Sequence, residues 1–251
     1  GDPVRLGEDV TVKAYFSEDS DIEAIVAGIK EKLGEIGKYL PVGRGFAGVS
    51  IVNEEDWANA WKKYYKPFRI SDRVVIKPSW EDYVPEGKEI IVELDPGMAF
   101  GTGSHETTRM CAVLLDKHIK PGDTVMDAGC GSGILSIIAA KLGAGRVVAF
   151  DIDGTAARVA RDNVEKNGAG DVVEVSRGTI EDVPDFAFNI IVANIIAEVI
   201  ISMAPQVPRY LESRGLFITS GIIRERRQDV IDACEKTGFE LAEEKAEGEW
   251  V

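Results

Sequence analysis

Residues 125–135 of the chain read VMDAGCGSGIL, and this stretch lies where a hydrophobic strand is expected to end and a helix to begin. Its glycines, Gly129, Gly131 and Gly133, would let the turn tighten and let the backbone approach a bound ligand closely. Their spacing is G-x-G-x-G, whereas NAD-binding folds use G-x-G-x-x-G. The turn alone therefore suggests a cofactor site without identifying the cofactor.

A carboxylate at the end of the next expected strand strengthens this interpretation. Asp151 lies 22 residues after Gly129 and closes the apolar run 147–151. A carboxylate in that place can accept hydrogen bonds from both ribose hydroxyls of a nucleoside-bearing cofactor. The alternative is a helix-capping aspartate, a role that the neighbouring Asp153 is able to take. We therefore predict that Asp151 binds ribose.

The chain around this turn alternates between apolar runs and helical patterns. Strands alternating with helices predict an α/β fold, a doubly wound, mostly parallel sheet with helices on both faces. The expected strands are 73–77, 89–94, 124–127, 147–151, 172–176, 189–194 and 216–220, and the expected helices are 134–142, 155–167 and 224–237.

The beginning of the chain reads as a smaller unit. Apolar residues at helical spacing predict a helix over 19–33. Strand candidates accompany it at 10–16, 38–41 and 46–52. We therefore predict a small α+β unit over residues 1–53, which is too short to bury much core alone.

A short helix is expected to connect this unit to the rest of the chain. Its apolar side spans 54–65, and Pro67 ends it because proline cannot continue a helix. Residues 54–67 are thus predicted to be a linker helix, and 68–251 the main domain.

A second glycine-rich stretch, LDPGMAFGTGSHETT, occupies residues 94–108. It lacks the lysine of a nucleotide P-loop, so a phosphate-binding role is not expected. It leads into a helix for which Thr107 or Thr108 is the predicted cap. Phenylalanine, histidine and threonine beside two glycines make it a candidate lid over a bound ligand.

The two glycine stretches together resemble known proteins. The turn with Asp127 and Asp151 is similar to that of class I S-adenosylmethionine-dependent methyltransferases. Residues 95–108 resemble the signature of the PrmA family, which methylates ribosomal protein L11, and 57–80, 194–197 and 220–222 resemble further family segments. The resemblance covers nearly the whole chain from Glu54 and, more loosely, the first unit.

This resemblance implies a class I, Rossmann-like methyltransferase fold, a ferredoxin-like N-terminal domain for substrate recognition, and S-adenosylmethionine as the cofactor. It implies trimethylation of lysine side chains and of the N-terminal amine of L11. The implied cofactor-binding residues are Phe100, Gly101, Thr102, His105, Thr107, Thr108, Asp127, Gly129, Gly131, Gly133, Asp151, Ile152, Thr179, Ile180 and Asn194.

Asn194 is the candidate catalytic residue, because it ends an expected strand where methyltransferases commonly bind the target nitrogen. The alternative is a strand-end asparagine that pairs with nearby backbone. Enzymes that act on glutamine or base amines commonly carry Asn-Pro-Pro-Tyr here, whereas this chain has Asn-Ile-Ile-Ala at 194–197. An aliphatic amine is therefore favoured, and no general base is identified.

Other functions remain as alternatives. They are a methyltransferase for another protein lysine, for a nucleic-acid amine or for a small-molecule amine. An NAD oxidoreductase would need a third glycine one position later. A non-catalytic protein that retains the cofactor fold would not need the intact glycines together with Asp151 and Asn194.

The charge of the chain limits the kinds of partner that it is expected to bind. The formal net charge is −14, and through Ile70 there are 10 Lys+Arg against 12 Asp+Glu, which leaves 19 against 31 in the rest. An acidic protein repels the phosphate backbone and attracts basic partners, so direct nucleic-acid binding is not expected.

Cysteine and histidine content give further expectations. The three cysteines are scattered and only two histidines are present, so no metal site is expected. No stretch approaches the roughly 20 apolar residues that span a bilayer, and the first residues lack a signal-peptide pattern. We expect a cytoplasmic, monomeric protein with no membrane contact.

Overall fold

The computed structural model describes residues 12–14, 16, 20–50, 62, 65–96, 101 and 103–251. The chain divides into two compact units, Gly1–Ala60 and Trp61–Val251, and each is described by itself.

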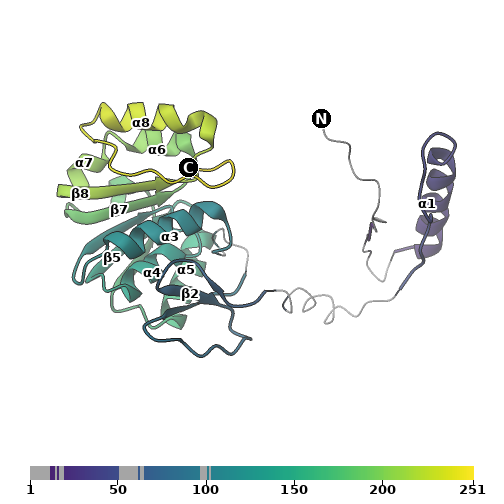
Figure 1. Ribbon diagram of the computed structural model, residues 1–251, viewed down its shortest axis with the longest axis horizontal. Coiled ribbons are helices and arrows are strands. Elements are labelled where there is room, and N and C mark those ends of the chain that lie inside the picture. The colour runs from purple at the N-terminus through teal and green to yellow at the C-terminus, as the bar shows by residue number, and fades with distance from the viewer. Residues whose placement is uncertain are drawn as a thin grey trace. The chain divides into compact units, whose positions relative to one another are not determined.

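The second unit is built on a five-stranded sheet in which every paired neighbour is parallel (Figure 1). Apolar runs form these strands because both faces of a parallel sheet are covered. The strands are β4 (Thr124–Ala128), β5 (Arg146–Asp151), β6 (Val173–Arg177), β7 (Phe188–Asn194) and β8 (Leu211–Ser220). Their order is β6-β5-β4-β7-β8, so the chain switches direction across the sheet between β4 and β7. The predicted α/β fold is confirmed, and such a switch point is where open α/β sheets bind ligands.

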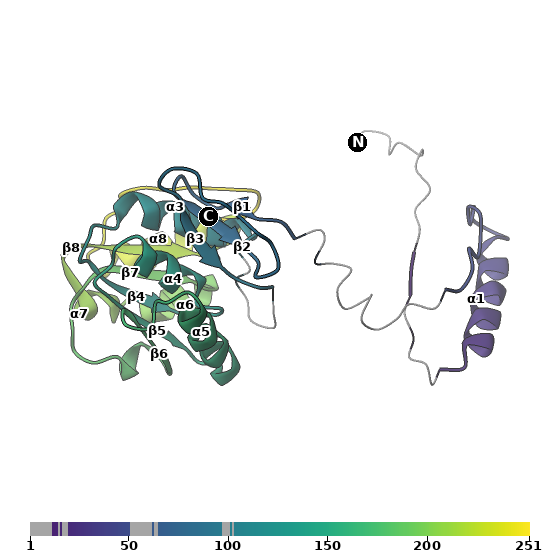
Figure 2. The ribbon, with the colours of Figure 1, turned by 90° about the horizontal axis from the view of Figure 1, so that it is seen from below.

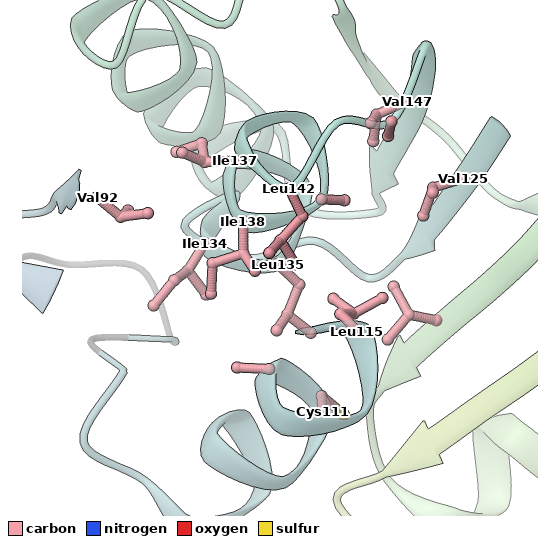
Figure 3. Close-up of a cluster of buried hydrophobic side chains, with 14 of the residues drawn as sticks. Val92, Cys111, Leu115, Val125, Ile134, Leu135, Ile137, Ile138, Leu142 and Val147 are labelled. Carbon is pink, nitrogen blue, oxygen red and sulfur yellow. The ribbon is translucent and has the colours of Figure 1, made fainter. Parts of the chain in front are cut away.

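Helices cover both faces of this sheet (Figure 2). They are α3 (Glu106–His118), α4 (Ile134–Lys141), α5 (Gly154–Lys166), α6 (Ala197–Met203), α7 (Val207–Tyr210) and α8 (Arg227–Glu235). Successive residues of a strand point to opposite faces. Val125 accordingly packs in one core cluster with α3 and α4, and Met126 packs in another with α6 and α7. Figure 3 shows Leu115 of α3 and Ile138 of α4 in the first cluster.

A three-stranded sheet packs into the same first cluster through Ile76 and Val92. Its strands are β1 (Phe68–Arg69), β2 (Val74–Lys77) and β3 (Ile90–Glu93), with β2 parallel to β3 and antiparallel to β1. Asp116 of α3 accepts hydrogen bonds from Ser71 Oγ at 2.8 Å and Arg73 Nε at 2.6 Å. These bonds tie the last part of α3 to the turn between β1 and β2.

The first unit differs from its prediction. Its helix α1 runs over Ile22–Ile36, three residues later than expected, because Asp21 caps it by accepting from Ala24 N at 3.0 Å. The strands predicted at 38–41 and 46–52 are not formed in the described residues up to 50. Residues 37–40 form the turn that ends α1, and Gly48 within the second predicted strand adopts a positive φ.

The remaining predictions for this region are not settled. The described residues of the strand predicted at 10–16, which are 12–14 and 16, are not in a strand, and most of the linker helix predicted at 54–65 lies outside the described residues. The ferredoxin-like arrangement and the domain limits 1–53, 54–67 and 68–251 therefore stay predictions.

Three details of the second unit also differ. Helices α6 and α7 were not predicted, because they are short and Pro208 falls in the first turn of α7. Strand β8 begins at Leu211 and not at 216. The helix predicted over 224–237 is divided into a 3₁₀ turn, Arg224–Arg226, and α8. Among the described residues, no helix is long and apolar enough to cross a membrane.

Replacement of Leu115 tests this packing. Its side chain is fully buried between α3 and the sheet, so Leu115→Ala is expected to lower the free energy of unfolding by about 2–5 kcal/mol. Urea denaturation measures the loss, and Leu241→Ala, at a leucine that is 54% exposed, is the matched control. Equal losses in the two variants would contradict the assignment of Leu115 to the core.

Candidate active site

The glycine turn lies at the carboxyl end of β4 and is dictated by close packing. Gly129, Gly131 and Gly133 all have positive φ. A Cβ on Gly129 would stand 2.5 Å from Ile195 Cγ2, and one on Gly133 would stand 3.1 Å from Ala160 Cβ. Any side chain at Gly129 would require the Ile195 side chain to move, and the positive φ would be strained, so glycine fits this position.

Asp151 closes β5 beside this turn. Its Oδ2 accepts from Gly131 N and its Oδ1 from Asp153 N, each at 2.9 Å. Asp153, and not Asp151, caps α5, because its Oδ1 accepts from Thr155 N at 2.8 Å. Each oxygen of Asp151 keeps acceptor capacity for a further donor such as a ribose hydroxyl.

Asp127 lies in the last part of β4, just before the turn, and is only 1% exposed. Ser136 Oγ donates to its Oδ2 at 2.5 Å, whereas the buried Oδ1 has no partner. Burial raises the pKa of this carboxyl to about 6, the charge of Asp151 adds to the rise, and the hydrogen bonds of Ser136 oppose it. A buried carboxylate oxygen without a donor is costly, so this atom fits a cationic ligand group.

The start of α3 corrects a prediction. His105 is the N-cap, and neither Thr107 nor Thr108 is. Thr107 N donates to His105 Nδ1 at 3.3 Å, and Thr107 Oγ1 lies 2.8 Å from the same nitrogen. The capping acceptor is thus an imidazole nitrogen and not the expected threonine hydroxyl. Both threonines are buried in the first turn of the helix.

The two glycine stretches meet. Ser132 Oγ donates to the carbonyl of Gly101 at 2.6 Å, and a Cβ on Gly103 would stand 3.0 Å from Ile134 Cδ1. The stretch before α3 therefore lies against the start of α4. Phe100 and Thr102, two of the predicted lid residues, lie outside the described residues.

Asn194 ends β7 beside α3. Its Nδ2 donates to Thr108 Oγ1 at 3.3 Å, and its buried Oδ1 has no partner. Within the described part of the chain, Asn194 Oδ1 and Asp127 Oδ1 are the buried side-chain oxygens or nitrogens that lack a partner. Nearly all such atoms in folded proteins are paired, so both oxygens are suited to accept hydrogen bonds from a ligand.

The other predicted residues lie at the ends of β5 and β6. Ile152 is 72% exposed just after β5, whereas Ile180 is buried in the second core cluster. Thr179 N and Oγ1 both donate to Asp182 Oδ2, at 2.8 and 3.2 Å. Because the side chain of Ile180 lies in the core, a ligand could contact this residue only through its backbone.

Two serines that the sequence analysis did not select support the site. Ser136 holds Asp127, and Ser132 links the two glycine stretches. Ser132 lies inside the glycine motif and Ser136 lies one helical turn after it. Their position next to the motif was the signal in the sequence that could have identified them as site residues.

Comparisons with known proteins agree with this geometry. Residues 2–251 match the family model described as ribosomal protein L11 methyltransferase (PrmA). Proteins of that name from Acetivibrio thermocellus and Ruminiclostridium cellulolyticum are 55% and 54% identical, and each alignment covers 98% of this chain and 78% of the relative.

A solved structure is also similar. The crystal structure of ribosomal protein L11 methylase from Lactobacillus delbrueckii subsp. bulgaricus has a TM-score of 0.66 and 36% identity, and the match covers 74% of this chain and 95% of that one. The methyl donor of this family is S-adenosylmethionine. The chain belongs to the ribosomal protein L11 methyltransferase (PrmA) family of S-adenosylmethionine-dependent methyltransferases.

Proposed function

We propose that the chain binds S-adenosylmethionine across the carboxyl ends of β4 and β5 and methylates amines of ribosomal protein L11. The observation that carries this proposal is the pair of buried, unpartnered oxygens, Asp127 Oδ1 and Asn194 Oδ1, on either side of the glycine turn. Family membership supplies the chemistry, and these residues of the chain supply acceptors for two nitrogen donors.

In this proposal Asp151 binds the ribose hydroxyls and Asp127 accepts from the ammonium at the amino-acid end of the cofactor. The backbone of Gly129, Gly131 and Gly133 borders the cofactor between these two carboxylates. Ile152, Thr179 and Ile180 lie next to the ribose site at the ends of β5 and β6. Residues 100–108 cover the cofactor from the other side, which agrees with the bond from Ser132 to Gly101.

Methyl transfer forms a bond from the amine lone pair to the methyl carbon as the bond from carbon to sulfur breaks. Sulfur keeps that electron pair, and the resulting alkylammonium releases its proton to solvent. The amine has to be neutral to attack, although the ordinary pKa of lysine is about 10.4. Asn194 Oδ1 orients the nitrogen, Thr108 fixes the amide of Asn194, and burial favours the neutral amine.

The proposed substrate is L11, at lysine side chains and at its N-terminal amine. The net charge of −14 suits a basic partner and disfavours direct nucleic-acid binding. Residues 1–53 are proposed to recognise the substrate, since no residue of α1 is buried and Ile36 is 46% exposed. The protein is proposed to act as a monomer in the cytoplasm, with 54–67 as the linker.

Intact-mass spectrometry tests the function. Incubation with S-adenosylmethionine and recombinant L11 is expected to add mass to L11 in steps of one methylene each. Asp151→Ala should abolish the increments, because it removes the ribose acceptor and the partner of Gly131 N. Unmodified L11 with the wild-type enzyme, under conditions where the cofactor binds, would exclude L11 as the substrate.

Asn194→Ala is expected to lower kcat for L11 by about 100-fold or more, because the group that orients the amine is lost. The affinity for S-adenosylmethionine should change little, since Asp127 and Asp151 remain. Steady-state kinetics and isothermal titration calorimetry measure the two quantities. Unchanged methylation by Asn194→Ala would remove this residue from the mechanism.

The affinity for S-adenosylmethionine is expected to depend on pH through Asp127. The carboxyl titrates at about 6 in the free protein, and a bound ammonium lowers that pKa. The cofactor then binds better to the ionised form, so affinity should rise up to about pH 6 and level off above it. Titrations across this range should give a flat profile for Asp127→Asn.

The contribution of Asp127 to the stability of the free protein is expected to follow the opposite trend. The folded pKa of Asp127 lies above its ordinary value of 3.8, so the folded state holds a proton that the unfolded chain has lost. This contribution is full below the ordinary pKa and is lost as the pH rises to about 6. Urea unfolding at several pH values should show the stability of the surface control Asp171→Asn declining relative to that of Asp127→Asn as the pH rises to about 6. The same decline in both variants would contradict the burial effect.

A further inference from the structure

Residues 247–251 fold back over the segment that follows β8. Glu247 and Trp250 close a tight turn through two backbone bonds of 2.9 and 3.0 Å. Val251 N donates to the carbonyl of Ile222 at 2.9 Å, and Ser220 Oγ donates to the carbonyl of Val251 at 2.9 Å. This 247–251 turn is therefore attached to the carboxyl end of β8.

Trp250 projects from the turn onto the start of α3. Its ring centroid lies 5.1 Å from that of His105, with the planes at 65°, which is an edge contact. Arg109 Nε donates to Glu247 Oε2 at 3.0 Å and ties the same turn to α3 one helical turn further on. Thr108, the partner of Asn194, lies between His105 and Arg109 in this first part of the helix.

Trp250 is thus connected to Asn194 through the first turn of α3, and it lies on the side of Asn194 that faces β8. Asn194 pairs with Ser220 in the sheet register, and Ile195 N donates to the carbonyl of Ser220 at 3.0 Å. On its other side, β7 neighbours β4, where Gly129 lies against Ile195. Asn194 therefore stands between the glycine turn and the 247–251 turn.

The direction of methyl transfer determines whether the cofactor or the acceptor amine lies beside Trp250. An in-line displacement places the nucleophile and the leaving sulfur on opposite sides of the methyl carbon. The proposed cofactor site lies toward β4 and β5. With the cofactor in that site, the amine would approach Asn194 from the β8 side, where the 247–251 turn places Trp250 against His105.

We propose that Trp250, held against His105, is the aromatic wall of the acceptor-amine site and contacts the aliphatic amine and its methylated products. This inference rests on the proposed function. Positive charge moves from sulfur to nitrogen during the transfer, and an aromatic ring stabilises a cation beside its face. Methylated ammonium groups are favoured partners of such rings, so Trp250 supports the second and third methylations in particular.

Trp250→Leu and Trp250→Phe test the wall. Loss of the ring in Trp250→Leu is expected to lower kcat/KM for L11 by about tenfold or more. The product should shift from trimethylated toward monomethylated amines. Trp250→Phe should recover most of the rate and the trimethylated product, because an aromatic face remains. A merely structural role would not separate these two variants by their methylation states.

The controls keep folding apart from chemistry. Trp80→Leu removes another tryptophan of the same unit, one that packs near Tyr65 with Lys62 over its ring, and it should leave kinetics and product states unchanged. Affinity for S-adenosylmethionine reports an intact site in the Trp250 and Trp80 variants. Trp250→Met replaces Trp250→Leu if the leucine variant does not bind the cofactor. His105→Asn keeps a capping side chain while removing the ring contact, and a partial loss is expected.

The outcomes distinguish this inference from the function on which it rests. Wild-type kcat/KM and product states in Trp250→Leu, with active wild-type enzyme, would overturn the aromatic wall and leave the proposed function intact. Equal losses in Trp250→Leu and Trp250→Phe would also overturn it. A wild-type enzyme that does not methylate L11 would overturn both.

Discussion

The close approach of Gly129 to Ile195 is the constraint on which the site depends. No side chain fits between the turn after β4 and the segment after β7, since an added Cβ would stand 2.5 Å from Ile195 Cγ2. The parallel pairing of β4 with β7 brings the carboxyl ends of the two strands side by side, and the glycine lets the two segments that follow them come close. Asp127 before the turn and Asn194 before Ile195 then come to lie on either side of one small region.

Electrostatics of the site follow from the same packing. Because the turn is tight, Asp127 is buried and keeps one oxygen without a donor. Asp151 stays partly accessible and is bonded to backbone N–H groups on both of its oxygens. One carboxyl therefore has a pKa raised to about 6 by burial, while the other is positioned as an acceptor by the backbone. Two residues of the same type are thus suited to different donors.

Much of the second unit could be predicted because its signals are local. Glycine spacing and apolar runs located β4, β5, β7 and the turn, since parallel strands are buried on both faces and helices have their own period. The cap of α3 was wrong because histidine is an uncommon cap, and its suitability depends on the extended backbone at His105. The strand predicted at 38–41 was wrong because the chain turns at residues 37–40 directly after α1, and the described residues 46–50 form no strand, with Gly48 at positive φ.

The residues that form the site could be predicted from the sequence, but their hydrogen-bond partners could not. The spacing of Asp127, Asp151 and Asn194 pointed to one edge of the sheet. The unpartnered oxygens depend on which long-range neighbours arrive, such as Thr108 from 86 positions earlier in the chain. Trp250 has no local motif that connects it to His105, because their contact exists only after β8 and the 247–251 turn have formed.

Strand β7 has a further consequence for how the protein can vary. Its alternate residues, Ile190 and Val192 against Ile191 and Ala193, belong to opposite core clusters, and Asn194 follows in the same register. A one-residue insertion or deletion within it would exchange both sets of side chains and replace the terminal amide at the same time. Length changes between Ile190 and Asn194 are therefore excluded by folding before any selection on catalysis acts, whereas the register is already irregular between Phe188 and Ile190.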